Sequence, residues 1–286
     1  NYGNVYPVRS FGPLTVFIKL MRKVSHALWT TPGIGTIGRR LQIVWHRGDK
    51  FYCPFCSYKA QRLAWIGADI PVLREHSVAG ARRRRGGCFR CGSKDRHRLI
   101  YAFLSKLLPR SEQSKLKSVL HFAPERCLFN YLKQLKLKNY KCVDINPDRF
   151  PTEMSVEHAD ILSLPFSADA FDLVLCNHIF EHIDNDIQAM KEVFRVLAPG
   201  GVAVMQVPMA PALDQTLEDP AVKDEKQRLR KFGQADHVRL YGKDYIKRLE
   251  DAGFTAEQLD LASEFPVFGL DPTEMLHIGM KAKYAQ

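Results

Sequence analysis

Long apolar runs are missing from this sequence. None of its 286 residues belongs to a run near the roughly 18 apolar residues that a membrane-spanning helix needs. Its first residues, Asn-Tyr-Gly-Asn, lack the basic region and following apolar region of a secretory signal. Disulfides need an oxidising compartment, so the seven cysteines are expected to stay reduced. These absences predict a cytoplasmic protein.

Acidic residues are scarce in the first part of the chain. Residues 1–118 contain 23 Lys and Arg but only 5 Asp and Glu. Residues 119–286 contain 19 Lys and Arg and 26 Asp and Glu. This opposition within a net charge of +11 indicates two modules rather than one uniform domain. The basic module would attract RNA, anionic lipid or an anionic substrate, or its charge would only favour solubility.

A basic amphipathic helix is predicted near the start. Residues 14–29 place apolar side chains such as Phe17 and Leu20 at helical spacing, with basic residues such as Lys19 mostly on the other side. Such a helix either packs on its own protein, which is the commoner outcome, or lies on a membrane surface. We assign residues 1–46 to a helical leader, with peripheral membrane contact as the alternative.

Two cysteine pairs predict a metal site. They have the C-x-x-C spacing and are Cys53 with Cys56 and Cys88 with Cys91. Four thiolates can bind one tetrahedral Zn²⁺ and leave no position for water, so we expect a structural zinc. His76 and His97 are alternative ligands. The 31-residue gap between the pairs exceeds the usual ~15–20 residues, which predicts an insertion between them.

The metal site defines a second predicted segment, a zinc-ribbon-like module with a connecting helix over residues 47–112. Within it, residues 82–87 (Arg-Arg-Arg-Arg-Gly-Gly) have the composition of a loop, with no aromatic residue between the arginines. Residues 98–108 are expected to form the helix that leads into the last domain.

From residue 117 onward, strands and helices alternate. Strands are expected at 118–122, 140–145, 171–178, 202–208 and 274–283, and helices at 128–135, 184–197 and 244–254. A tight turn is expected at residues 199–201. This alternation predicts an α/β domain over residues 113–286, with a mostly parallel sheet between two layers of helices.

Acidic residues follow the predicted strands where a nucleoside would bind. Open α/β sheets bind ligands at the carboxyl ends of their strands, where the strand order reverses. Asp144 ends the second strand, where a carboxylate can accept both ribose hydroxyls. Asp160 is placed to accept the adenine amino group, with Ile161 beside the ring. Their joint order predicts S-adenosylmethionine as the cofactor.

Several motifs resemble those of a known enzyme family. They are DILSLPF (160–166), FDLVLCNHIFEHI (171–183), EVFRVLAPGGVAVMQVP (192–208) and LEDAGF (249–254). With them, residues 118–256 resemble a class I, Rossmann-like methyltransferase of the type-11 kind. More narrowly, CFRCGSKDRHRLIYAFL (88–104), HFAPE (121–125) and FGQADHVRLYG (232–242) are similar to uncharacterised bacterial methyltransferases with an N-terminal four-cysteine ribbon.

The resemblance implies a Rossmann-like, seven-stranded, mostly parallel sheet with a small N-terminal zinc-ribbon domain. It also implies the cofactor-binding residues, which are Phe122, Ala123, Pro124, Glu125, Asp144, Ile145, Asp160, Ile161, Leu162, Asn177 and His178. The segment HFAPE departs from the family, which has a glycine-rich loop there. Without glycines the backbone cannot approach the methionine part in the usual way, so we expect Glu125 to contact the cofactor's amino group.

The expected activity is O-methylation of a sugar, a glycan intermediate or another small hydroxylated metabolite. A hydroxyl acceptor needs a base, and His237 is our first candidate and His182 the second. Residues 209–236 are expected to form a mobile lid over the acceptor. One alternative is an RNA base methyltransferase whose basic zinc module grips phosphate. Another is a non-catalytic zinc-binding adaptor with a degenerate methyltransferase fold.

Overall fold

The computed structural model describes residues 34–107 and 116–283. The predicted helix over residues 14–29 lies outside them. The chain divides into two compact units, residues 1–47 and 48–286. In the first unit the described residues form helix α2 (Ile34–Trp45), which lies in the segment assigned to the helical leader but after the helix predicted over residues 14–29. None of the helices in the described parts of the chain is long and apolar enough to cross a bilayer.

The second unit begins with the cysteine module, two strand pairs and two helices. The elements are β1 (Arg47–Cys53), β2 (Tyr58–Ala60), β3 (Ala64–Ile66), α3 (Pro71–Glu75), β4 (Arg84–Gly87) and α4 (Asp95–Leu107). Strand β1 pairs with β2, and β3 pairs antiparallel with β4. The expected insertion between the cysteine pairs therefore carries β2, β3, α3 and β4.

The loop predicted over residues 82–87 was wrong for its last four residues, which form strand β4. A glycine there allows close packing, because a Cβ at Gly86 would lie 2.4 Å from Asp95 Oδ2 at the start of α4. Composition alone missed the strand because its arginines and glycines have low strand propensity, while pairing with β3 stabilises it.

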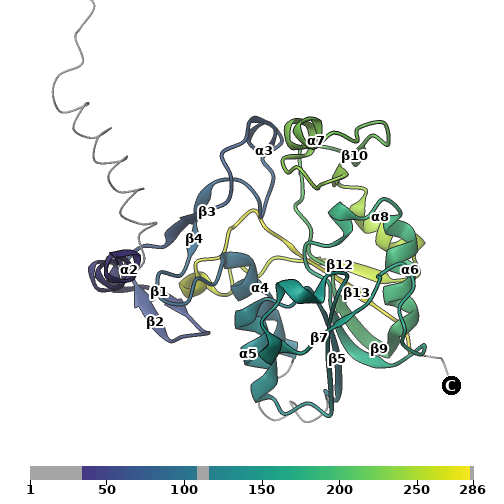
Figure 1. The fold of residues 1–286 in the computed structure, drawn as a ribbon, viewed down its shortest axis with the longest axis horizontal. Helices are drawn as coiled ribbons and strands as arrows, with labels where there is room; N and C mark the ends of the chain where they lie inside the picture. The colour runs from purple at the N-terminus through teal and green to yellow at the C-terminus, as the bar shows by residue number, and fades with distance from the viewer. Residues whose placement is uncertain (1–33, 108–115, 284–286) are drawn as a thin grey trace, which may run out of the picture. The chain divides into compact units, whose positions relative to one another are not determined.

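A seven-stranded sheet forms the rest of the unit (Figure 1). Its strands are β5 (Ser118–Phe122), β6 (Asn139–Asp144), β7 (Val156–His158), β8 (Phe171–Leu175), β9 (Leu197–Val204), β12 (Thr255–Leu259) and β13 (Leu276–Met280). The strand order is β12-β13-β9-β8-β5-β6-β7. The predicted Rossmann-like sheet is confirmed. We had not predicted β7 or β12, and the turn expected at residues 199–201 lies inside β9.

The order of the strands reverses next to β5. The chain runs from β5 to β6 and β7 on one side and then returns to β8 on the other, and all these neighbours pair in parallel. Strand β9 continues in parallel next to β8, and β13 is antiparallel to both β9 and β12. The carboxyl ends of β5, β6 and β8 therefore form the crevice where such sheets bind ligands.

Helices cover both faces of the sheet (Figure 1). They are α5 (Arg126–Gln134), α6 (Asp186–Val196) and α8 (Tyr245–Asp251), together with α4 of the cysteine module. Leu99, Ile100 and Leu104 of α4 share an apolar core with Val119 and Leu173 of the sheet. Residues of α6 and α8, such as Met190 and Leu249, share a second core. Because α4 covers one face of the sheet, the cysteine module and the sheet form one compact unit.

The segment after β9 is folded onto the cysteine module. It contains β10 (Leu217–Glu218) and α7 (Glu225–Phe232), and β10 pairs with β11 (Arg239–Leu240). Phe232 is buried in one apolar cluster with Val72 and Leu73 of α3. Within residues 34–107 and 116–283, short 3-10 helices lie at Pro147–Arg149, Thr152–Met154, Phe180–His182 and Pro266–Phe268.

Candidate functional site

A cavity of about 660 Å³ lies at the carboxyl ends of β5, β6 and β8. Seven of the eleven predicted cofactor residues line it, namely Phe122, Ala123, Asp144, Ile145, Asp160, Ile161 and His178. Pro124, Glu125, Leu162 and Asn177 are not among its lining residues. The cavity thus occupies the crevice at which the strand order reverses.

The β6 side of the cavity has a carboxylate next to an exposed apolar side chain. Asp144 is buried; its Oδ1 accepts the Asn146 N–H at 2.8 Å and its Oδ2 accepts from Arg149 at 2.5 Å. Ile145 is 61% exposed and offers an apolar surface to a planar ring. Asp160 accepts the Leu162 N–H at 2.9 Å, which fixes the turn after β7.

The HFAPE turn is held by a buried histidine. His121 lies 2.9 Å from Tyr140 Oη through Nδ1 and 3.0 Å from Glu125 Oε2 through Nε2. Burial alone would raise the pKa of Glu125, but the hydrogen bond with His121 and nearby positive charge lower it to about 2. Ala123 takes the left-handed conformation that glycine usually adopts, with a φ of 42°. The turn is therefore built without glycine, and Glu125 contacts His121 beneath it.

The residues after β8 place buried polar groups on the cavity wall. His178 has a φ of 54°, and its Nδ1 lies 3.1 Å from Glu181 Oε1. Burial lowers the pKa of His178 far below its ordinary value and raises the pKa of Glu181 to about 8. His178 Nε2 and Glu181 Oε2 are buried without a hydrogen-bond partner. Backbone strain and unpaired polar atoms of this kind are typical of functional sites.

The two candidate bases lie side by side but only one lines the cavity. The rings of His182 and His237 are 4.8 Å apart at an angle of 87°. His182 lines the cavity, with its Nδ1 3.3 Å from Asp236 Oδ2. His237 is buried, is not among the lining residues, and has no hydrogen-bond partner for either ring nitrogen. Burial lowers the pKa of both, to about 4 for His237, so both rings are neutral at pH 7.

Arg239 of the FGQADHVRLYG segment fixes the turn after β8. It is buried, and it donates hydrogen bonds to three backbone carbonyls of that turn, those of Phe180, Ile183 and Asp184. The Val238 N–H also donates to the Glu181 carbonyl at 2.9 Å. This segment therefore positions His182 and Glu181 at the wall of the cavity.

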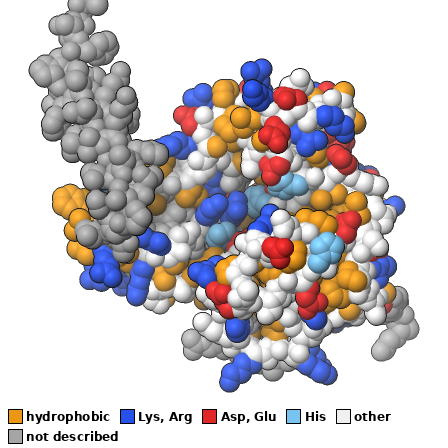
Figure 2. All heavy atoms as spheres, viewed as in Figure 1, with side chains coloured by type: hydrophobic (Ala, Val, Ile, Leu, Met, Phe, Trp, Pro, Cys, Tyr) orange, Lys and Arg blue, Asp and Glu red, His pale blue; other side chains and the backbone are white. Residues whose placement is uncertain are grey.

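A second cavity of about 580 Å³ adjoins the first. Its wall comes from β3, α3 and β4 of the cysteine module on one side and from residues 229–236 on the other. Five residues line both cavities, namely Lys94, Arg96, His178, Gln234 and Asp236. Figure 2 shows basic side chains and histidines together in the hollow of the face in view. The two cavities thus offer neighbouring spaces for two ligands.

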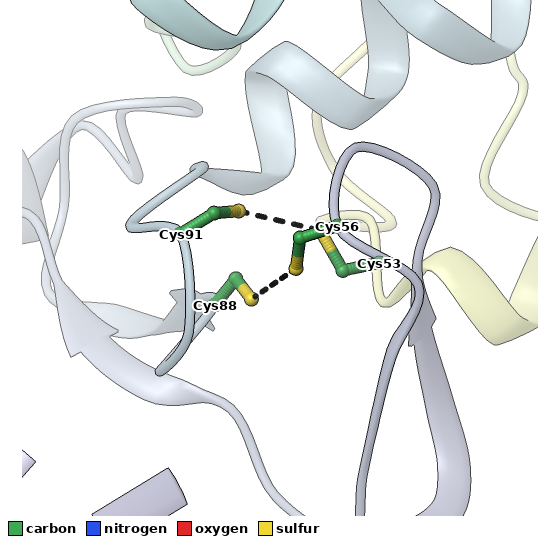
Figure 3. Close-up of side chains that lie close together, drawn as sticks. All are labelled: Cys53, Cys56, Cys88 and Cys91. Atoms are coloured by element: carbon green, nitrogen blue, oxygen red, sulfur yellow. Dashed lines mark hydrogen bonds between the residues drawn. The ribbon is translucent and has the colours of Figure 1, made fainter. Parts of the chain in front are cut away.

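The four predicted cysteines converge at a single point (Figure 3). Cys53 Sγ lies 3.6 Å from Cys91 Sγ, and Cys56 Sγ lies 3.7 Å from Cys88 Sγ. A tetrahedral zinc with Zn–S bonds of ~2.3 Å requires sulfur atoms ~3.8 Å apart, so this spacing fits the ion.

The cysteine cluster is tied to the sheet through a buried arginine. Arg98 of α4 donates to the Ser93 carbonyl at 3.0 Å, next to the second cysteine pair. It also donates to the Gly86 carbonyl at 2.9 Å and to the Phe268 carbonyl at 2.5 Å. Because one guanidinium joins the metal loop, β4 and the C-terminal segment, the position of α4 depends on the loop around the cysteines.

A second group of metal-binding residue types lies beside the cavity. In the described ranges, Glu181, His182 and His237 each place one ligand atom within 4.8 Å of the others. Burial keeps the two imidazoles neutral and raises the pKa of Glu181 to about 8, so this group carries little charge at pH 7. It is suited to hydrogen bonding and proton transfer.

Lys94, Arg96, Gln234 and Asp236 line the cavity but were not predicted as cavity residues from the sequence. A signal was present, because all four belong to the motifs CFRCGSKDRHRLIYAFL and FGQADHVRLYG. These motifs lie far apart in the sequence, and only the fold shows that they share a wall.

Comparison with known proteins identifies the domain. Residues 127–205, from α5 to the end of β9, match a family model described as a methyltransferase domain. An uncharacterised protein of Methanocaldococcus jannaschii is 36% identical over 78 residues, which are 27% of this chain and 28% of that protein. The chain thus matches little more than a quarter of this relative.

Solved structures with a similar fold include two S-adenosylmethionine-dependent methyltransferases. That from Mesorhizobium loti has a TM-score of 0.42 and 16% identity, covering 63% of this chain and 95% of its own. That from Archaeoglobus fulgidus has a TM-score of 0.41 and 15% identity, covering 64% and 94%. A third structure is a Haloferax volcanii complex of a methyltransferase with the Trm112 methyltransferase activator. Its TM-score is 0.39 and its identity 17%, covering 66% of this chain and 93% of its own.

Proposed function

We propose that this chain, which carries a class I S-adenosylmethionine-dependent methyltransferase domain, methylates a hydroxyl of a sugar, a glycan intermediate or another small hydroxylated metabolite. The observation that carries this proposal is the second cavity, which is of small-molecule size and shares five wall residues with the first. A donor in the first cavity and an acceptor in the second would meet at these shared residues.

The first cavity has the groups that the methyl donor needs. Asp144 ends β6 at the crevice and would accept the ribose hydroxyls in place of its present contact with Arg149. Ile145 and Ile161 would flank the adenine, and Asp160 would accept its amino group. The donor's reactive methyl would then lie near the turn after β8, where His178 and His182 line the wall.

Of the two candidate bases only His182 lines a cavity, next to Asp236, which lines both cavities, so we assign removal of the acceptor's proton to His182. Its contact with Asp236 occupies Nδ1, which leaves Nε2 for the acceptor hydroxyl. The donor would supply the methyl group, which the acceptor oxygen would take as the carbon–sulfur bond breaks, so that S-adenosylhomocysteine leaves. The released proton passes to His182. His237 packs against His182 at the back of the wall and holds its ring in place.

The four cysteines would hold a zinc ion with a structural role. They fill all four positions of a tetrahedral ion, so the metal would fix the loop before α4 rather than activate a ligand. Helix α4 and the segment around Lys94 would contribute by positioning the ligands, because they line both cavities.

Radiolabelled methyl donor tests the proposed acceptor class. The full chain is incubated with labelled S-adenosylmethionine and, separately, with small-molecule, glycan and RNA fractions, and Asp144→Ala serves as the inactive control. We expect label in a small-molecule or glycan fraction that base treatment does not release, as for an ether. Label found only in RNA would reject the acceptor class and leave methyl transfer intact.

An RNA base acceptor is the second candidate, and one surface feature favours it. Trp65 of β3 is 53% exposed, with the guanidinium groups of Arg83 and Arg85 at 5.2 and 4.5 Å from its ring. A basic and aromatic surface of this kind suits a nucleic-acid strand. This candidate would be favoured by an RNA affinity that falls steeply with salt concentration. It would also be favoured if Trp65→Ala abolished both RNA binding and methylation.

A further inference from the structure

We propose that Lys94 and Arg96 form an oxyanion-binding site where the two cavities meet. This inference rests on the proposed function. The oxyanion has two sources: the carboxylate in the methionine part of the donor, or a carboxylate or phosphate group on the acceptor. Both residues line both cavities, so either ligand could reach them.

Carboxylates lie near the two cations without contacting them, since the charges of Asp95 and Glu125 raise the pKa of Lys94. No carboxylate within residues 34–107 and 116–283 forms an ion pair with either side chain, and Arg96 Nε is buried without a hydrogen-bond partner. The charge of Arg96 and burial both lower the pKa of Lys94, so the two groups destabilise each other. Burying such groups without an anion is costly, and a bound oxyanion would satisfy both.

Neighbouring acids are already engaged elsewhere. Asp95, between the two cations in sequence, accepts two hydrogen bonds from Arg84 at 2.6 and 2.7 Å. Asp271 and Glu274 lie 3.3 and 3.5 Å from the same guanidinium. Arg84 is thus neutralised while Lys94 and Arg96 are not. This contrast separates a structural arginine from two cations that face the cavities.

The acids on the cavity walls form no ion pair with the two cations. Asp144 pairs with Arg149, Asp160 accepts a backbone N–H, and Asp236, which lines both cavities, contacts the neutral His182. Burial raises the pKa of Glu181 to about 8, so this group is mostly uncharged at pH 7. Both cations at the junction therefore remain available to a bound anion.

An oxyanion suits this pair of side chains. A guanidinium donates two parallel hydrogen bonds to a carboxylate or phosphate, and an ammonium adds a compact charge. The HFAPE turn lacks the glycines that would let backbone N–H groups approach the donor's amino-acid part. Side chains from the cysteine module could supply that contact instead.

Calorimetric titration of the full chain separates the two sources. The ligands are S-adenosylhomocysteine, which has the carboxylate, and 5′-methylthioadenosine, which lacks it. The variants are Lys94→Gln with Arg96→Gln, the milder Arg96→Lys, and Arg62→Gln as an exposed control on the same module. If the donor's carboxylate binds here, the double variant loses ~10- to 100-fold in affinity for S-adenosylhomocysteine and nothing for 5′-methylthioadenosine.

Inorganic phosphate tests the acceptor side, with and without saturating S-adenosylhomocysteine. If an acidic acceptor binds here, phosphate binds the donor-saturated wild type and Arg62→Gln, and the double variant loses this binding while its donor affinity is unchanged. Arg96→Lys keeps the positive charge and should therefore retain part of whichever binding the double variant loses. This intermediate affinity would show that the loss in the double variant does not come from misfolding.

Two results would overturn the oxyanion site. One is equal loss of affinity for both nucleosides in the double variant and in Arg96→Lys, which indicates a structural role. The other is a double variant that binds both nucleosides and phosphate as the wild type does. A wild type that binds neither nucleoside would reject the proposed function instead, and the phosphate titration without donor would still decide the oxyanion site.

Discussion

His182 and His237 differ in their access to the cavity. Replacing His182 by Ala should lower the rate of methyl transfer ~10²- to 10⁴-fold, because a general base is lost. Its affinity for S-adenosylhomocysteine should fall far less than the rate, because Asp144, Asp160 and the flanking isoleucines hold the donor. His237→Ala is the matched comparison, and single-turnover rates with the identified acceptor are the measurement. A larger loss in His237→Ala would restore our first candidate as the base.

The pH profile of the same reaction follows from burial. Desolvation lowers the pKa of His182 below its ordinary value of 6.5, so the neutral, proton-accepting ring is already present at pH 7. The rate should therefore rise with pH in the acid range with an apparent pKa below 6.5, and it should be flat from about pH 7.5 upward. A rate that still rises between about pH 7.5 and 9 would contradict this expectation and indicate a different base.

Asp144 carries the predicted contact with the ribose. Asp144→Ala should weaken binding of S-adenosylhomocysteine by ~1.5–3 kcal/mol, because hydrogen bonds to a charged group disappear. Asp148→Ala, an exposed acid four residues away, is the control and should leave affinity unchanged. Calorimetric titration measures both. Equal affinities in the two variants would show that the donor does not lie against β6.

Ala123 is a non-glycine residue in the left-handed region. Ala123→Val should cost ~1–3 kcal/mol of the free energy of unfolding, because a β-branched side chain is strained at a φ of 42°. Ala123→Gly relieves that strain and should keep or raise stability. Urea unfolding compares the two variants. A stable Val variant would mean that the turn adopts another conformation in solution.

At the scale of elements, the loop around the cysteines sets the start of α4. The double variant Cys88→Ser/Cys91→Ser should lose bound zinc and unfold at lower temperature, since two of four thiolates are gone. Cys127→Ser, which changes a thiol outside the cluster, should keep about one zinc per chain. Metal analysis and thermal melting decide this. Full zinc content in the double variant would rule out these ligands.

Elements with strong local patterns were predictable, and those that depend on distant partners were not. Strand β5 has the predicted residues 118–122, and α4 and α6 differ from prediction by at most three residues at an end. In contrast, β4 consists of arginine and glycine and depends on β3 for its hydrogen bonds. Likewise, Trp65 reaches Arg83 and Arg85 only across the β3–β4 pair.

At the scale of the whole molecule, buried acids set how stability depends on pH above neutrality. Burial raises the pKa of Glu181 to about 8 and of Glu274 to about 7, so the folded chain keeps two protons that the unfolded chain has lost. The free energy of unfolding should therefore fall by ~3 kcal/mol as the pH rises from 6.5 to 8. Below about 6.5 the buried histidines, with lowered pKa values, act in the opposite direction.

Glu274→Gln tests this dependence. It should remove ~1–2 kcal/mol of the fall between pH 6.5 and 8, because one of the two retained protons no longer titrates. Glu153→Gln, on an exposed acid, should leave the fall unchanged. Urea unfolding at the two pH values gives both numbers. An identical fall in wild type and Glu274→Gln would mean that Glu274 is ionised in the folded protein.

The candidate site was predictable only where it follows the sheet. Asp144, Asp160 and His178 come directly after strands, and strand order alone brings them to one edge. Lys94 and Gln234 reach the same wall from the cysteine module and from the segment after β9. No periodicity or motif in one segment shows that contact, because it results from packing of α3 against α7 and of α4 against the sheet.

The packing of α4 also determines where this protein could be divided by recombination. A shortened gene that starts at residue 113 would encode all seven strands, yet it would lack the helix that covers Val119 and Leu173. Such a product would expose an apolar face to water and lose both cations of the cavity junction. The segment that folds as one unit is therefore longer than the segment that carries the methyltransferase motifs. Recombination points between residues 91 and 118 would separate α4 from the sheet that it covers.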